Sequence, residues 1–206
     1  MKDLKRNVLS TAKRMYQEAL VSGSSGNVSA YDPESGLMAI TSSGTDYDQM
    51  TEADIIVMHP DGRVVSGNGE PSSEWRMHAL VYRQRADVRS VVHTHSPYAT
   101  GFAVLHQTIP LILIEMVPFI GGDVPVAAFA MPGTEELGQE ALEVLSDRNG
   151  CLLMNHGVLA IGQDTAEAYV RSVYIEDAAK IYFNARSVGE PFVLPEEITR
   201  QLMEQA

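Results

Sequence analysis

The sequence is poor in cysteine and has no long apolar segment. Cys151 is the only cysteine among the 206 residues, so no disulfide can form within the chain, which is consistent with a reducing cytosol. No apolar run reaches the roughly 18 residues that a membrane-spanning helix needs, and the N-terminal MKDLKRNVLS has no apolar signal core. The sequence therefore predicts a cytoplasmic protein that does not contact a membrane.

Positive charge is also scarce. The chain has 15 Lys and Arg residues against 27 Asp and Glu residues, which gives a formal net charge of −12. A chain with this charge repels polyanions, which argues against nucleic acid as a partner and against an anionic membrane surface. A small anionic ligand stays compatible with the sequence if backbone amides, hydroxyl groups or a metal cation hold it locally.

Motifs of several common enzyme classes are missing. There is no HExxH pair, no CxxC pair, no GxxxxGK[ST] loop and no GxGxxG fingerprint. Cys151 is followed by Leu152 and Leu153, and this apolar setting favours a core residue over a nucleophile. Any catalytic site must therefore be built from other residue types.

Length and hydrophobic pattern predict one domain over residues 1–206. The strands and helices mix without strict βαβ alternation, so we expect an α/β or α+β sandwich with a central, mostly antiparallel sheet flanked by helices. The pattern predicts helices at residues 3–21, 73–85, 97–105, 134–147 and 164 to about 185, and strands at residues 36–41, 55–58, 63–65, 88–94, 110–117, 151–155 and 158–161.

Two histidines follow the apolar run that contains Val91 and Val92. In an extended strand, residues i and i+2 point to the same face, so His93 and His95 share a face with their roots about 6–7 Å apart. Two imidazoles at that separation can bind one metal ion. The alternative is a polar strand end that binds nothing, and the pair alone does not decide between the two.

A third histidine lies in Asn155-His156-Gly157, where an apolar run breaks at a glycine. Glycine allows the backbone to turn there and a ligand to approach closely. Together with His93 and His95, His156 would leave further positions of a divalent ion open for substrate or a carboxylate, as in a catalytic site. A polar turn residue is the equally open alternative.

Glu74 follows Ser72 and Ser73 at the start of a predicted helix. We expect one of the serines to cap the helix and Glu74 to lie in its first turn. One interpretation is compensation of the helix dipole, which contributes about 0.3–1 kcal/mol. The other is an anion pocket of hydroxyl groups and free amides beside a carboxylate that moves a proton.

Five short motifs occur in the same order as in a known family. They are Ser25-Gly26-Asn27-Val28-Ser29, Thr41-Ser42-Ser43-Gly44, Pro71-Ser72-Ser73-Glu74-Trp75-Arg76, His93-Thr94-His95 and Asn155-His156-Gly157. On these motifs, over roughly residues 5–190, the chain resembles the class II aldolase/adducin family of sugar-phosphate enzymes. The resemblance implies a single-domain α/β sandwich that assembles as a fourfold-symmetric homotetramer with sites at the subunit contacts.

The resemblance also assigns roles to residues. His93, His95 and His156 correspond to the ligands of a divalent metal, usually zinc, although manganese or cobalt would suit the same donors. Glu74 corresponds to the catalytic acid/base, which can also ligate the metal when no substrate is bound. The phosphate pocket of the sugar-phosphate substrate corresponds to Gly26, Asn27, Ser43, Gly44, Ser72 and Ser73.

The implied reaction is the reversible cleavage of a ketose 1-phosphate, such as L-fuculose 1-phosphate or a 5-deoxypentulose phosphate. The cation stabilises the enediolate left when the C3–C4 bond breaks, and Glu74 protonates it to give dihydroxyacetone phosphate. Other family members imply alternatives on the same metal site: a sugar-phosphate 4-epimerase, a dehydratase or a decarboxylase. Adducin heads, which lack the metal ligands, imply a scaffold, but this chain retains all three histidines and Glu74.

One position departs from the family pattern. Similar ketose-phosphate aldolases place a tyrosine where this chain has Glu115, and they draw a second tyrosine from a C-terminal tail, whereas residues 201–206 contain none. Glu115 is therefore the candidate catalytic residue for protonating the released aldehyde. A carboxylate at a strand end or a subunit contact is the open alternative.

Overall fold

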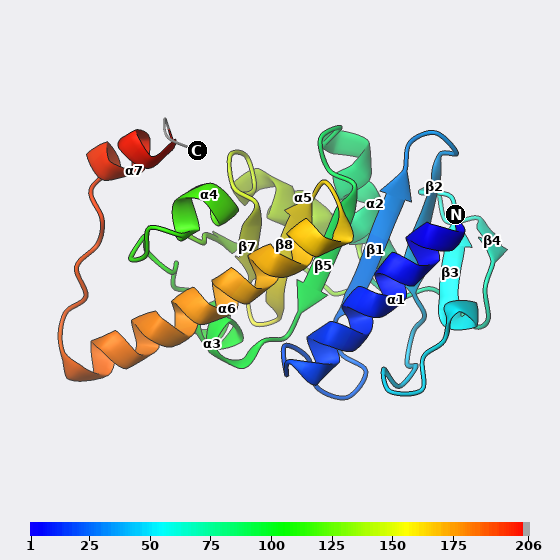
Figure 1. The fold of residues 1–206 in the computed structure, drawn as a ribbon, viewed down its shortest axis with the longest axis horizontal. Coiled ribbons are helices and arrows are strands. Elements are labelled where there is room, and N and C mark those ends of the chain that lie inside the picture. Colours follow the sequence, from blue (N-terminus) through cyan, green and yellow to red (C-terminus); the bar gives the residue numbers. More distant parts are fainter. Residues whose placement is uncertain (204–206) are drawn as a thin grey trace.

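Eight strands form one continuous sheet in the computed structural model, which describes residues 1–203 (Figure 1). The strand order is β4-β3-β2-β1-β5-β8-β7-β6, and every neighbouring pair is antiparallel except β6 with β7. The mostly antiparallel α/β architecture predicted from the sequence is confirmed. The strands are β1 Asn27–Asp32, β2 Leu37–Thr41, β3 Ile55–Met58, β4 Val64–Ser66, β5 Ser90–Thr94, β6 Val126–Ala127, β7 Gly150–Leu153 and β8 Gly157–Gly162.

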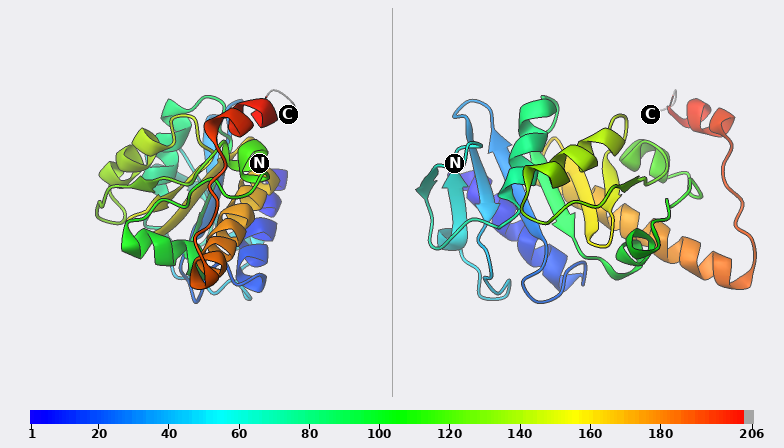
Figure 2. Two further views of the ribbon diagram at one scale, coloured as in Figure 1. Left: turned by 90° about the vertical axis from the view of Figure 1, so that its left-hand side faces the viewer. Right: turned by 180° about the vertical axis from the view of Figure 1, so that it is seen from behind.

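Helices cover both faces of the sheet. α2 and α5 pack together on one face, whereas α1 and α6 lie on the other, with α3 and α4 packed against α6 (Figure 1 and Figure 2). No helix in residues 1–203 combines the length and the apolar character needed to cross a membrane. The helices are α1 Lys2–Gln17, the 3₁₀ turn η1 Glu52–Asp54, α2 Trp75–Gln84, α3 Pro97–Leu105, α4 Met116–Ile120, α5 Glu135–Val144, α6 Thr165–Val188 and α7 Glu196–Met203.

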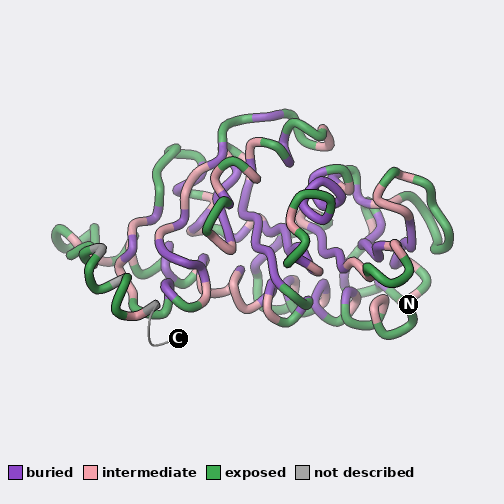
Figure 3. Tube along the Cα trace, turned by 90° about the horizontal axis from the view of Figure 1, so that it is seen from above, coloured by how far each residue is buried: buried purple, intermediate pink, exposed green. Residues whose placement is uncertain are grey.

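Apolar side chains on both faces of the sheet explain why the inner strands read as continuous apolar runs. Because side chains alternate along a strand, Cys151 and Leu153 pack under α2 and α5, while Leu152 packs with α3, α4 and α6. The buried segments run through the centre of the molecule (Figure 3). Cys151 is fully buried in this core, which confirms a core residue rather than a nucleophile, and burial raises the pKa of its thiol to about 12.

The strand predicted at residues 110–117 is wrong. Ile109 makes an isolated bridge to Val124, the chain then runs without regular structure, and α4 begins at Met116. The buried residues Met116, Val117 and Ile120 follow helical spacing. A short apolar run cannot by itself distinguish a strand from a buried helical turn.

Strand β1 was not predicted, although it lies near the centre of the sheet between β2 and β5. Small, turn-forming residues at 22–27 lead directly into this strand, and they indicate a break in the chain rather than the start of a strand. Asn27 and Ser29 alternate with Val28 and Ala30, and all four residues are buried, so the polar residues of this strand face the interior as well. This strand matters because it begins with Asn27, a residue of the site.

Candidate active site

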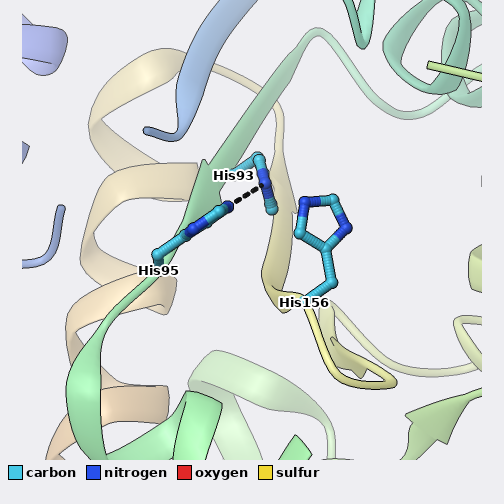
Figure 4. Close-up of side chains that lie close together, drawn as sticks. All are labelled: His93, His95 and His156. Atoms are coloured by element: carbon cyan, nitrogen blue, oxygen red, sulfur yellow. Dashed lines mark hydrogen bonds between the residues drawn. The ribbon is translucent and has the colours of Figure 1, made fainter. Parts of the chain in front are cut away.

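Three histidines meet at one end of the sheet. His93 belongs to β5, His95 follows its last residue, and the antiparallel pairing of Thr94 with Val158 brings the turn between β7 and β8 alongside. His156 lies in that turn. Figure 4 shows the rings converging, and one ligand atom from each lies within 4.8 Å of the others. Residues predicted to share a metal are therefore adjacent in the fold.

The ring nitrogens have the arrangement that a cation requires. Nε2 of His93 lies 3.0 Å from Nε2 of His95. His93 donates from Nδ1 to the carbonyl oxygen of Val158 at 2.8 Å, so its Nε2 can act as a metal ligand once it has lost its proton. Two ring nitrogens this close need a proton or a cation between them, and zinc bound at 2.0–2.1 Å would separate tetrahedral nitrogen ligands by about 3.3 Å. The donor set fits a divalent metal.

Close packing explains the glycine that follows His156. A Cβ on Gly157 would overlap the carbonyl oxygen of Thr94 and lie 3.1 Å from Cδ2 of His95 and 3.2 Å from Cε1 of His93. Any other residue would therefore push the backbone away from these two imidazoles. The glycine fixes how closely the β7–β8 turn approaches the end of β5.

Glu74 is the fourth member of the cluster. It is the N-cap residue of α2 rather than a residue of the first turn, and its own amide donates to Ser72 Oγ at 3.3 Å. Its Oε2 lies 3.1 Å from Nε2 of His93, and its Oε1 lies 3.3 Å from Nε2 of His156. Asn27 donates from Nδ2 to Oε2 at 2.9 Å. The carboxylate faces the imidazoles because the helix begins just after it.

Electrostatics keep Glu74 ionised. Burial acts to raise the pKa of Glu74, but the charge and hydrogen bond of His93, the charge of His156 and the amide of Asn27 outweigh it and hold this pKa well below its usual range. Burial, together with the charge of neighbouring His93, lowers the pKa of His95 and of His156 to about 4. An ionised, buried carboxylate beside two imidazoles whose pKa values are lowered favours a cation at this position, as metal binding requires.

A pocket of about 200 Å³ opens beside the cluster. Three segments supply ten of its lining residues: the segment that leads into β1, the loop after β2 and the segment before α2. The residues predicted to bind the substrate phosphate are in this pocket, but none of its lining residues is Lys or Arg. The lining residues are Ser24, Ser25, Gly26, Asn27, Ser42, Ser43, Gly44, Ser72, Ser73, Glu74, His95, Pro132 and His156.

All six residues predicted for phosphate binding line this one pocket, together with Glu74 and two of the histidines. Sequence reasoning did not assign Ser24, Ser25, Ser42 or Pro132. The serines adjoin assigned residues, so their motifs carried a signal, whereas Pro132 lies in a loop without any motif. Glu115 does not line the pocket: it is exposed, at the N-cap of α4.

The remaining histidines lie outside the cluster. His59 lies in the turn that joins β3 to β4, and its amide donates to the carbonyl oxygen of Arg63. His78 is fully buried on α2 and bonds Ser29 Oγ through Nδ1 at 2.6 Å. His106 caps the end of α3 in a left-handed conformation. These three histidines therefore lie in a turn, on a helix and at a helix end.

Comparison with known proteins identifies the family. Residues 6–183 match the family model described as the class II aldolase and adducin N-terminal domain. The chain belongs to this family. A structure of an L-fuculose 1-phosphate aldolase is 40% identical, superimposes with a TM-score of 0.94, and shares 98% of this chain and 95% of its own length.

Curated relatives give the same assignment. The chain is 37% identical to the 5-deoxy-D-ribulose 1-phosphate aldolase of Bacillus thuringiensis serovar kurstaki, over 94% of this chain and 90% of the relative. It is 31% identical to the L-fuculose phosphate aldolase of Escherichia coli K12, over 98% of this chain and 93% of the relative. With the histidine cluster in place, the chain is a metal-dependent aldehyde-lyase of the class II aldolases that acts on a sugar phosphate.

Proposed function

We propose that this aldolase reversibly cleaves a ketose 1-phosphate to dihydroxyacetone phosphate and an aldehyde. The position of Glu74 carries the proposal. An ionised carboxylate lies between two imidazoles, 3.1 Å from His93 and 3.3 Å from His156, and also lines the pocket of hydroxyl and amide donors. A substrate whose phosphate occupied this pocket would therefore present its adjacent carbons to both the carboxylate and the metal ligands.

Each group then has a distinct task. A divalent cation held by His93, His95 and His156 would supply Lewis-acid stabilisation of the negative charge that develops when the C3–C4 bond breaks. Glu74 exchanges the C3 proton of dihydroxyacetone phosphate, giving it up in cleavage and removing it in synthesis. Asn27 fixes one carboxylate oxygen through its 2.9 Å hydrogen bond and leaves Oε1 without a donor among the described residues.

We assign the phosphate to Gly26, Asn27, Ser43, Gly44, Ser72 and Ser73. The absence of Lys and Arg from the pocket lining agrees with the charge of −12, because hydroxyl groups and amides can hold a phosphate without any formal positive charge. The lining of the same pocket includes His95 and His156, so a phosphate held there would lie beside the metal ligands.

A 5-deoxypentulose 1-phosphate is the substrate that we favour over L-fuculose 1-phosphate. One relative is named as a 5-deoxy-D-ribulose 1-phosphate aldolase. Cleavage of either ketose phosphate would release an aldehyde that ends in a methyl group, and the aldehyde from the 5-deoxypentulose phosphate lacks the hydroxyl group that the other carries.

Glu115 is the proposed donor of the aldehyde-side proton. It does not line the pocket of its own chain, so we propose that it acts at the site of a neighbouring copy in a homotetramer. Size-exclusion chromatography with light scattering tests the assembly, and a Glu115→Gln variant tests the role. We expect this variant to cleave ketose phosphate more slowly while still exchanging the C3 proton of dihydroxyacetone phosphate.

We further propose zinc as the metal, with manganese or cobalt as replacements, because three imidazoles and a carboxylate suit all three ions. A cytoplasmic location agrees with the single buried cysteine. Metal analysis of protein purified without added metal tests the first proposal. We also propose that residues 1–206 form one domain.

The function is tested by a coupled assay for dihydroxyacetone phosphate release. We expect release from both ketose phosphates, with the larger kcat/KM for 5-deoxyribulose 1-phosphate. No release from metal-loaded protein would contradict the proposal and favour an epimerase, dehydratase or decarboxylase.

A further inference from the structure

Neutral donors can bind a phosphate tightly only if they are already oriented toward it. The phosphate pocket has hydroxyl groups and backbone amides but no Lys or Arg in its lining. Hydroxyl groups can rotate to suit a ligand, whereas an amide is fixed by the backbone around it. The groups that fix the loop before β1 therefore bear directly on affinity for the phosphate.

Tyr47 holds this loop from outside the pocket. Its hydroxyl contacts two successive carbonyl oxygens, that of Ser25 at 3.0 Å and that of Gly26 at 2.8 Å. The side chain is 2% exposed and does not line the pocket. Burial, together with the charge of Glu74, raises the pKa of Tyr47, so the hydroxyl stays protonated and donates to these carbonyls.

The planar peptide bond transmits this contact to the pocket. In a trans peptide the C=O and the N–H point in opposite directions, so the Ser25 carbonyl turned toward Tyr47 directs the Gly26 N–H away from Tyr47. Gly26 lines the pocket, and its amide has no hydrogen-bond acceptor among residues 1–203. This amide is therefore available to an anion in the pocket.

The loop has little freedom to compensate if this contact is lost. Gly26 has a φ of +74°, and a Cβ at this position would lie 2.6 Å from Cγ1 of Val21 and 2.7 Å from the carbonyl oxygen of His93. The backbone thus already lies against β5 and cannot move closer to it. Rotation of the Ser25–Gly26 peptide is the movement that remains, and the Tyr47 hydroxyl opposes it.

We propose that Tyr47 is a positioning residue that holds the Gly26 amide toward the substrate phosphate. The inference rests on the proposed function, because it takes this pocket as the phosphate site. Tyr47 does not touch the substrate; it acts through the Ser25–Gly26 peptide. Its loss should weaken phosphate binding and leave the proton transfer by Glu74 intact.

Tyr47→Phe removes one hydroxyl and keeps the ring, and Tyr16→Phe is the matched control. The two rings stack with centroids 5.8 Å apart, but the Tyr16 hydroxyl makes no hydrogen bond to the loop within the described part of the chain. For Tyr47→Phe we expect KM to rise about 10-fold and the inhibition constant of inorganic phosphate to rise equally, with kcat within about threefold of the wild type. Tyr16→Phe should change neither constant.

A second measurement uses the wild-type protein alone. In an NMR titration with inorganic phosphate, the Gly26 amide should shift and saturate at the inhibition constant. An unmoved Gly26 amide would overturn the inference even if Tyr47→Phe failed to fold. Unchanged phosphate inhibition in a folded Tyr47→Phe variant would also overturn it and leave the proposed function standing. Wild-type protein that neither binds phosphate nor releases dihydroxyacetone phosphate would contradict both.

Discussion

The substitution Glu74→Gln tests the proposed acid/base directly. Glutamine has nearly the shape of glutamate, so one side-chain oxygen can still accept the hydrogen bond from Asn27, and the three imidazoles are untouched. The change removes the group that moves the C3 proton. General acid–base catalysis contributes about 10²- to 10⁴-fold, so we expect kcat to fall by that factor, which corresponds to about 3 to 5 kcal/mol of barrier.

Proton exchange isolates this step from the rest of the reaction. Dihydroxyacetone phosphate is incubated with protein in D₂O, and loss of the C3 proton signal is followed by NMR. We expect the wild type to catalyse exchange and Glu74→Gln to lose it while retaining one metal ion per chain. Exchange by Glu74→Gln at the wild-type rate would refute the assignment of the base.

Glu70→Gln is the matched control. It removes the same charge four residues earlier in the chain, from a residue that is exposed and does not line the pocket. This variant should exchange the proton and cleave substrate at wild-type rates. If it lost activity to the same degree, the effect of Glu74→Gln would reflect the general charge of this segment rather than proton transfer.

Three further predictions follow from the described residues. His95→Ala should weaken divalent metal binding at least about 100-fold, measured by competition with a chelating dye, without loss of the folded structure. The Cys151 thiol, whose pKa is raised to about 12 by burial, should resist a thiol reagent at pH 8 until the protein is unfolded; rapid modification of native protein would contradict its burial. Burial lowers the pKa of His78 to about 3, so the stability that its neutral form contributes is complete above pH 6.5 and is lost as pH falls toward 3. The free energy of unfolding of metal-free protein, measured in urea between pH 7 and pH 5, should therefore depend less on pH in His78→Gln than in the wild type. The difference should correspond to at most about one proton taken up on unfolding. An equal pH dependence in the two proteins would show that His78 does not titrate this way.

Much of the site could be predicted because short-range geometry fixes it. The spacing of His93 and His95 predicts a shared face at the end of a strand, and Asn155-His156-Gly157 indicates a turn at the end of an apolar strand. That these two segments are neighbours depends on the pairing of β5 with β8, which joins residues more than 60 positions apart. No local pattern reports such a pairing, and the family resemblance supplied it.

Other features could not be predicted from local pattern for identifiable reasons. The segment 110–117 is apolar because it packs against α3 and α6, and packing of this kind looks the same for a strand and for a helical turn. Strand β1 has a polar, fully buried Ser29, whose side chain bonds His78 and Tyr82 inside the core. Residues 27–30 do alternate polar and apolar residues, but Asn and Ser are also typical turn residues, so the pattern could not be distinguished from a continuation of the turn before it.

The role of Glu74 depends on the residue at which α2 begins. As a first-turn residue it would stabilise the helix dipole, but as the N-cap residue it turns its carboxylate to Asn27 and the imidazoles. Helix boundaries are uncertain by one or two residues from sequence, so the two interpretations could not be separated before the structure was known.

Metal dependence of dihydroxyacetone phosphate release is the most direct test of the central claim. Protein is stripped with a chelator and then titrated with zinc while release from 5-deoxyribulose 1-phosphate is followed. The account predicts no release from metal-free protein and recovery that saturates at one ion per chain. Release at the wild-type rate by metal-free protein would contradict it.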